Sequence, residues 1–260
     1  MFGFFGKRRR AELRAAPFPE AWAVVLDGLP LVRELSAEDR RVLEGHVAVF
    51  VADKHFEGAG GLELDDEQCV VIAAQACLLL LGQDVDEPYP SLDTVLVYPR
   101  TWRTHASRTE DGLVHEREER RSGESWKRGL VILAWDEVRR GATDEDDGQN
   151  VVLHEFAHQL DTALGPADGL PPLPERAMYA PWARVLGREY ADLVARIHAG
   201  RPADIDAYGA TSPAEFFAVV TEAFFERPTA LKRQHPDLYE QLAAFYKQDP
   251  AAREPRADGG

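Results

Sequence analysis

The 260-residue sequence predicts an α+β protein that is mainly helical and contains a small mixed sheet. Long segments repeat apolar residues at the three- and four-residue intervals of a helix with one buried face. Two shorter runs, residues 93–98 and 129–135, are strongly apolar and are expected to be strands. The sheet is therefore expected in the first half of the chain, and the second half is expected to be helical.

Three helices are expected before the first strand. Residues 18–26 and 36–49 have helical patterns, and the second of these opens at Ser36 with an acidic first turn. Residues 65–82 are expected to form a buried helix, because their longest apolar run is interrupted only by Gln75. That run is too short to span a bilayer, so no transmembrane segment is predicted.

The strands come next. Residues 93–98 are ended by Pro99, and residues 113–120 alternate enough to form a second strand before a Ser-Gly turn signal. Residues 129–135 supply the third strand. After an acidic loop at 144–148, helices are expected at residues 148–163, 179–199, 213–226 and 236–247.

One domain is expected over residues 17–250, preceded by an irregular N-terminus at 1–16 and followed by a polar tail at 251–260. In the first ten residues the aromatic side chains precede the basic ones, which is the reverse of a signal peptide. The alternative for this segment is a weak contact with anionic lipids.

The charge and the cysteines of the sequence indicate which partners and which compartment to expect. A formal net charge of −15 argues against direct binding of nucleic acid, because phosphates would be repelled. Cys69 and Cys77 are eight apart on one expected buried helix, so they are interpreted as core thiols rather than a disulfide. Together with the absence of an export signal, these features predict a cytoplasmic protein.

The residues with the clearest chemistry are His154-Glu155-Phe156-Ala157-His158, an H-E-x-x-H pattern on an expected helix. Residues four apart share one helix face, so His154 and His158 can reach one metal ion. Zinc accepts imidazole nitrogen, and a catalytic site keeps a position open for water. Glu155 is then placed to take a proton from that water. The pattern predicts hydrolysis, most readily of a peptide bond.

A third ligand is expected further along the chain, and the residues alone leave two alternatives. Ser212 and Pro213 open a helix in which Glu215 takes the capping-box position. Glu222 lies seven residues later, near the same side of that helix. One of the two glutamates could bind the metal while the other orients a histidine.

Tyr208, seven residues before Glu215, is a further candidate, since a phenol near a metal can donate to an oxyanion. The alternative is a packing tyrosine. The remaining histidines have no ligand spacing to the motif and are interpreted as ordinary side chains: His46, His55, His105, His115, His198 and His235.

Several segments together resemble the Mlc titration factor A family of zinc metallopeptidases. The matching segments are residues 153–161, 205–208, 212–219, 222–225 and 245–250, with weaker likenesses at 96–99 and 122–126. The resemblance implies a gluzincin-type, zincin-like core similar to the protease domain of anthrax lethal factor. It also implies aminopeptidase-type activity, and the enterobacterial member binds a transcriptional repressor of glucose uptake.

Carried over residue by residue, the resemblance implies one Zn²⁺ per chain, held by His154, His158 and Glu215. It implies that Glu155 is the general base and that Tyr208 assists the oxyanion. In zincins an edge strand above the metal helix pairs with extended substrate, and residues 113–120 and 129–135 are the candidates here.

The leading hypothesis is therefore a zinc-dependent peptidase acting on peptide or protein substrates. The rival is a regulatory protein-binding module with a zinc site and little proteolysis. The intact Glu155 favours catalysis, because a structural zinc site needs no base. A non-peptide metallohydrolase is disfavoured, because no segment suggests a phosphate or nucleotide pocket.

Overall fold

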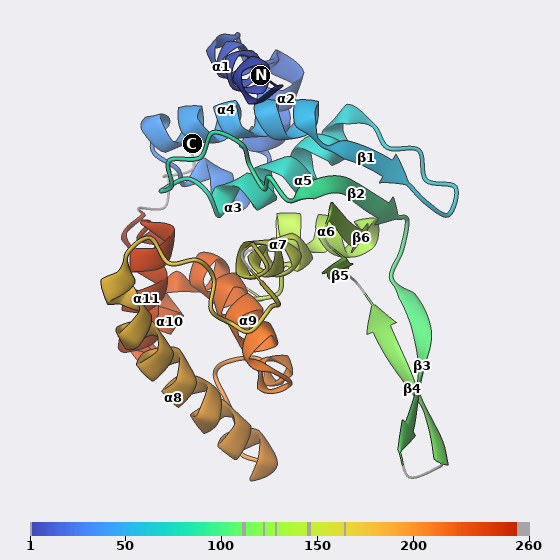
Figure 1. Ribbon diagram of the computed structural model, residues 1–260, viewed down its shortest axis with the longest axis vertical. Helices are drawn as coiled ribbons and strands as arrows, with labels where there is room; N and C mark the ends of the chain where they lie inside the picture. The colour runs from blue at the N-terminus through green and yellow to red at the C-terminus, as the bar shows by residue number, and fades with distance from the viewer. Residues whose placement is uncertain are drawn as a thin grey trace, which may run out of the picture.

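The computed structural model describes residues 2–110, 113–121, 123–127, 129–144, 147–163 and 165–253. Within them the chain is mainly helical with a small sheet, as the sequence predicts (Figure 1). The helices are α1 Phe2–Ala15, α2 Glu20–Asp27, α3 Pro30–Arg33, α4 Ala37–Asp53, α5 Asp66–Leu78, α6 Trp135–Thr143, α7 Val151–Asp161, α8 Tyr179–His198, α9 Pro213–Glu226, α10 Pro228–Gln234 and α11 Pro236–Tyr246. Short 3₁₀ turns occur at Arg176–Met178 (η1), Ala207–Ala210 (η2) and Pro250–Ala252 (η3).

The main sheet has four strands in the order β1-β2-β6-β5: β1 His55–Gly58, β2 Leu92–Tyr98, β6 Gly129–Ala134 and β5 Gly123–Lys127. The first three run parallel, and β5 pairs antiparallel with β6. Strands β3 (Trp102–Glu110) and β4 (Leu113–Arg121) pair only with each other among the described strands. The turn signal at Ser122-Gly123 thus precedes a strand that the sequence did not reveal.

The expectation for the substrate-pairing edge is wrong for residues 129–135, which form an inner strand, and residues 113–120 do not belong to the main sheet. Residues 113–120 belong to the separate two-stranded sheet, and residues 129–134 lie between β2 and β5. The edge strand next to the metal-motif helix is β5, which contacts α7. A five-residue strand with one apolar side chain has no pattern from which this position could be inferred.

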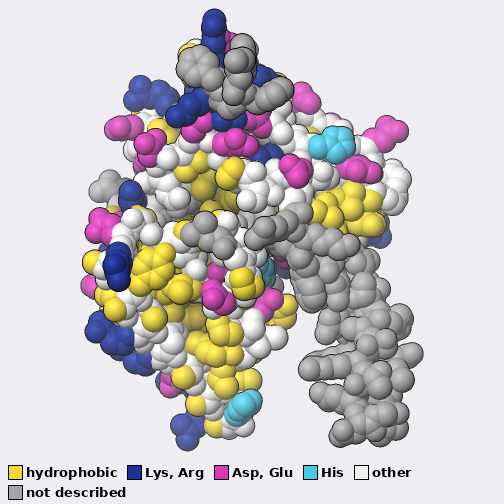
Figure 2. All heavy atoms as spheres, viewed as in Figure 1, with side chains coloured by type: hydrophobic (Ala, Val, Ile, Leu, Met, Phe, Trp, Pro, Cys, Tyr) yellow, Lys and Arg dark blue, Asp and Glu magenta, His cyan; other side chains and the backbone are white. Residues whose placement is uncertain are grey.

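The N-terminal segment is helical over Phe2–Ala15, where an irregular conformation was expected. Arg10 pairs with Asp86 at 2.6 Å and with Glu87 at 3.0 Å, and Arg14 donates to the carbonyl oxygens of Val85 and Asp86. Figure 2 shows basic side chains next to acidic ones at this end of the molecule. The helix is held by partners about 70 residues away, which no local pattern could indicate. Of the expected tail, residues 254–260 lie outside the described residues.

Helix α7 lies at the centre of the fold and packs against α5, α6 and α9. The side chain of Phe156 is fully buried. The centroid of its ring lies 5.7 Å from that of Phe50 in α4 and 4.7 Å from that of Tyr89. Phe156 therefore ties the helix to the N-terminal half of the core. The opposite face of α7 is left for the two histidines.

The loop after α7 connects it to the C-terminal helices through Gly169. The N–H of Gly169 donates to Asp161 Oδ2 at 2.8 Å, and the carbonyl of Gly169 accepts from Trp182 Nε1 at 3.0 Å. Gly169 has φ +78°, and a Cβ there would lie 2.5 Å from the carbonyl oxygen of Pro213. A glycine is required here, and its contacts help to set the first turn of α9 beside α7.

Phe156→Ala is expected to lower the free energy of unfolding by about 3–5 kcal/mol, because it leaves a cavity beside the rings of Phe50 and Tyr89. Urea unfolding followed by far-ultraviolet circular dichroism measures the change. Val24→Ala is the control, since Val24 is 66% exposed and its truncation should change stability by no more than about 0.5 kcal/mol. Equal stabilities of the two variants would contradict this account of the core.

Candidate metal centre

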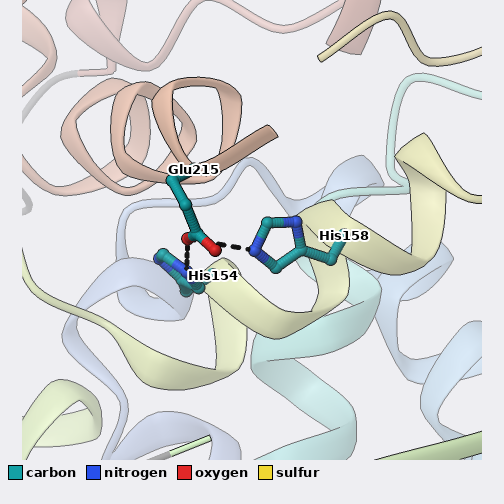
Figure 3. Close-up of side chains that lie close together, drawn as sticks. All are labelled: His154, His158 and Glu215. Atoms are coloured by element: carbon teal, nitrogen blue, oxygen red, sulfur yellow. Dashed lines mark hydrogen bonds and ion pairs between the residues drawn. The ribbon is translucent and has the colours of Figure 1, made fainter. Parts of the chain in front are cut away.

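The first two side chains of the centre come from one face of α7. Asn150 caps the helix, because its Oδ1 accepts from the N–H groups of Val152 and Leu153 at 3.1 Å each. His154 and His158 follow at a four-residue spacing, and their ring centroids lie 4.9 Å apart. Figure 3 shows both imidazoles directed toward the beginning of α9.

The third side chain comes from the first turn of α9. Ser212 caps this helix by accepting from the N–H of Glu215, and Pro213 takes the first helical position. Glu215 Oε2 then lies 3.0 Å from His154 Nε2 and 3.3 Å from His158 Nε2 (Figure 3). Local capping chemistry thus places the carboxylate at the helix end that faces α7.

These three side chains fit a zinc ion. One ligand atom from each, two imidazole nitrogens and one carboxylate oxygen, lies within 4.8 Å of the others. Ligand atoms about 2.0–2.1 Å from a tetrahedral zinc ion are separated by about 3.3 Å, close to the two distances to Glu215. Only this group of His, Cys, Asp and Glu side chains meets that criterion among the described residues.

Glu222 contacts the other nitrogen of the first histidine. Its Oε1 lies 2.7 Å from His154 Nδ1, and its Oε2 accepts from the N–H of Asn150 at 2.5 Å. The two glutamates, two turns apart on α9, therefore contact opposite sides of one imidazole. The geometry puts Glu215 on the side of His154 that faces His158, and it puts Glu222 on the opposite side of that imidazole.

Glu155 is buried on α7 between the two histidines of the motif and is 5% exposed. Its Oε2 is one of the buried side-chain oxygens without a hydrogen-bond partner among the described residues. Burial raises the pKa of Glu155 to about 7, while the imidazoles of His154 and His158 act in the opposite direction. A buried carboxyl group with a raised pKa thus lies beside the three potential ligands.

Tyr208 lies beside His154 of the centre. It belongs to the 3₁₀ turn η2, where its N–H donates to Asp206 Oδ1 at 2.8 Å. Its ring centroid is 5.9 Å from that of His154, and the residue is 55% exposed. The structure thus brings Tyr208 next to the metal-motif histidine, on the solvent side.

The chain is similar over most of its length to a known metallo-peptidase family. A model of the family described as glucose-regulated metallo-peptidase M90 matches residues 5–247. The chain belongs to this family. The Mlc titration factor A proteins of Klebsiella pneumoniae and of an Enterobacter species are 35% and 34% identical to it, over 91% of this chain and 88% of theirs. An uncharacterized protein of Synechocystis is 42% identical over 93% of this chain and 89% of its own length.

Membership of the metallo-peptidase family implies that the protein binds a metal ion. It also confirms the family resemblance found in the sequence. Among the residues that the structure describes, no helix is both long and apolar enough to cross a membrane.

Sequence reasoning did not single out Asn150. The signal was present, because an asparagine directly before an apolar helical run is a strong N-cap. Its contact with Glu222, however, joins residues 72 positions apart. The sequence offered contact with a histidine as one alternative for Glu222, but it gave no sign of the second contact, with the N–H of Asn150.

The charges at the centre are strongly coupled. Burial acts to lower the pKa of His154, but Glu222 and Glu215 outweigh it and hold that pKa well above the usual value. Burial acts to raise the pKa of Glu215, but hydrogen bonds with His154 and His158 outweigh it and lower that pKa to about 2. The centre therefore favours a carboxylate at Glu215 across the physiological range.

This coupling predicts a pH dependence for metal-free protein. Because the pKa of Glu215 is about 2 when folded and about 4.5 when unfolded, its ionised form stabilises the fold above about pH 4.5. That contribution, on the order of 3 kcal/mol, is lost as the pH falls toward 2. Glu215→Gln should therefore destabilise metal-free protein at pH 6 and make much less difference near pH 2.5. Denaturant unfolding at both pH values measures this, and a pH-independent gap would contradict it.

Proposed function

We propose that the protein is a zinc-dependent peptidase of aminopeptidase type, with one zinc ion held by His154, His158 and Glu215. The observation that carries this proposal is the convergence of two α7 imidazoles and one α9 carboxylate beside the buried Glu155. The family supports the metallopeptidase class. The zincin-like, gluzincin-type core proposed for residues 17–250 rests on the same ligand pattern.

His154, His158 and Glu215 would hold the zinc ion, which when bound would lower the pKa of a water molecule toward neutrality and polarise the scissile carbonyl. Glu155 accepts the proton of the attacking water and later returns it to the leaving amine. Its raised pKa suits this exchange, because a group that titrates near the working pH can both take and give a proton. A cation at the three ligands would act on that pKa in the same direction as the two imidazoles.

Two neighbouring residues have supporting roles in the proposal. Glu222 accepts a hydrogen bond from Nδ1 of His154 and so orients its Nε2 toward the metal. Tyr208 donates its phenolic hydrogen to the oxyanion that forms as water attacks, which its position beside His154 supports. Strand β5 is the proposed docking edge for extended substrate, because it is an edge strand that contacts α7.

A second proposed function is a regulatory one, through binding of a transcriptional regulator. It is favoured by the name of the relatives, Mlc titration factor A, which describes an interaction with a protein named Mlc. The proposed location is the cytoplasm, in line with two free cysteines, one of them fully buried.

Glu155→Gln is expected to keep zinc and to lower hydrolysis of peptide reporters by about 10²–10⁴-fold, because an amide cannot accept the proton. Metal content and steady-state kinetics on one protein batch measure both effects. His154→Ala is the matched comparison, and it should lose zinc as well as activity. Activity of Glu155→Gln within about a factor of two of wild type would remove Glu155 from the mechanism.

Tyr208→Phe is expected to lower kcat more than it raises KM, with normal zinc content, because an oxyanion is present mainly in the transition state. A tyrosine that only packs would leave kcat unchanged and alter at most the melting temperature. Kinetics and thermal unfolding of the same sample distinguish the two roles. An unchanged kcat contradicts the oxyanion role.

A further inference from the structure

A closed ring of hydrogen bonds joins the start of α7 to the metal centre. The N–H of Asn150 donates to Glu222 Oε2 at 2.5 Å, and Glu222 Oε1 lies 2.7 Å from Nδ1 of His154. The ring closes through the backbone, because the N–H of His154 donates to the carbonyl of Asn150 at 2.9 Å. The helix cap and the first histidine of the motif thus share one carboxylate.

The side chain of Asn150 is tied to three elements. Its Oδ1 caps α7, and its Nδ2 donates to Gln75 Oε1 of α5 at 2.8 Å and to the carbonyl of Gly141 in α6 at 3.1 Å. A Cβ at position 141 would lie 3.0 Å from Asn150 Cγ, so glycine permits this close approach. Asn150 is 1% exposed, and its side-chain oxygen and nitrogen and its backbone N–H and carbonyl all have partners.

Gln75 is the polar residue that interrupts the apolar run of the buried helix α5. Its Nε2 donates to the carbonyl of Val71 at 3.1 Å, which turns its Oε1 toward Asn150. Gln75 is 3% exposed, so an unpaired amide there would cost free energy. Its partner across the helix interface explains why a glutamine occurs in that otherwise apolar segment.

We propose that Asn150, held by Gln75 and the Gly141 carbonyl, is a positioning residue of the metal centre that acts through Glu222 on the imidazole of His154. The inference rests on the proposed zinc site and goes beyond it by adding two residues outside the motif. It differs from ordinary helix capping, which needs only the accepting oxygen of a side chain such as Ser or Asp. Asn150 differs from such a cap because its Nδ2 also donates two hydrogen bonds, to Gln75 and to the carbonyl of Gly141.

The closed ring of hydrogen bonds requires two acceptor atoms at Glu222. One accepts from the Asn150 N–H, and the other accepts from the N–H at Nδ1 of His154. A carboxylate has two acceptor oxygens, whereas an amide has one acceptor oxygen and a nitrogen that only donates. With Nδ1 as donor, Nε2 keeps its lone pair for a metal ion. The position of the Asn150 backbone therefore determines where Glu222 is held and which nitrogen of His154 faces Glu215.

The test measures Zn²⁺ affinity by competition with a chromogenic chelator, and the absorption bands of bound Co²⁺ as a reporter of ligand geometry. Asn150→Ser keeps a helix cap but loses the link to α5 and α6, and its Zn²⁺ affinity should fall by about 10–100-fold. Gln75→Leu leaves the cap intact and should lower the affinity severalfold. Both should alter the Co²⁺ bands.

Two control variants separate positioning from stability. Ser36→Ala removes the cap of α4, and Ile72→Val trims the same buried helix that carries Gln75. Each should lower the melting temperature and leave the Zn²⁺ affinity within about twofold of wild type. If Asn150→Ser does not fold, Gln75→Leu with its Ile72→Val control tests the proposal alone.

A double-mutant cycle tests the route through Glu222. Adding Asn150→Ser or Gln75→Leu to Glu222→Gln should weaken Zn²⁺ binding little beyond Glu222→Gln itself, because the shared route is already broken. Fully additive losses, or unchanged affinity in Asn150→Ser and Gln75→Leu, would overturn the inference while wild type still binds zinc. A wild-type protein that binds no zinc would instead overturn the proposed function on which the inference rests.

Discussion

The contact on which the rest of the centre depends is the crossing of α7 and α9 at His154. One imidazole lies between two carboxylates of a single helix, with Nε2 3.0 Å from Glu215 and Nδ1 2.7 Å from Glu222. Because the glutamates are two turns apart, only one rotation of α9 can present both to the same ring. A rotation by one residue would bring an apolar side chain to the histidine and leave a buried carboxylate without its partner.

Because the crossing of α7 and α9 is buried, its polar and charged side chains need hydrogen-bond partners. Charged and polar groups placed among Phe156, Phe216 and other fully buried side chains need partners, because an unpaired charge in such surroundings is costly. The protein meets the requirement with a continuous polar path from Gln75 through Asn150 and Glu222 to His154. Glu155 Oε2 has no such partner among the described residues, and neither has either carboxylate oxygen of Glu226.

The surrounding scaffold serves this crossing. Phe156 anchors α7 to the N-terminal half, and Gly169 joins the loop after α7 to Asp161, Trp182 and the start of α9. The sheet presents one edge, β5, beside α7. Tyr208 is then brought to the rim by a short turn before α9, so the side chains that meet at the centre come from three separate elements.

The sequence by itself determined the parts that depend on local spacing. The H-E-x-x-H interval put two histidines on one face of a helix, and Ser212-Pro213 put Glu215 in the first turn of the next. The mainly helical class also depends on local spacing, because apolar residues that recur every three or four positions indicate a helix. Only the tertiary structure showed that Glu215 faces Nε2 and Glu222 faces Nδ1 of His154, that β5 is the edge strand beside α7, and that the N–H of Asn150 donates to Glu222. Those outcomes depend on contacts between residues up to 75 positions apart, where chain packing rather than local pattern sets the distances.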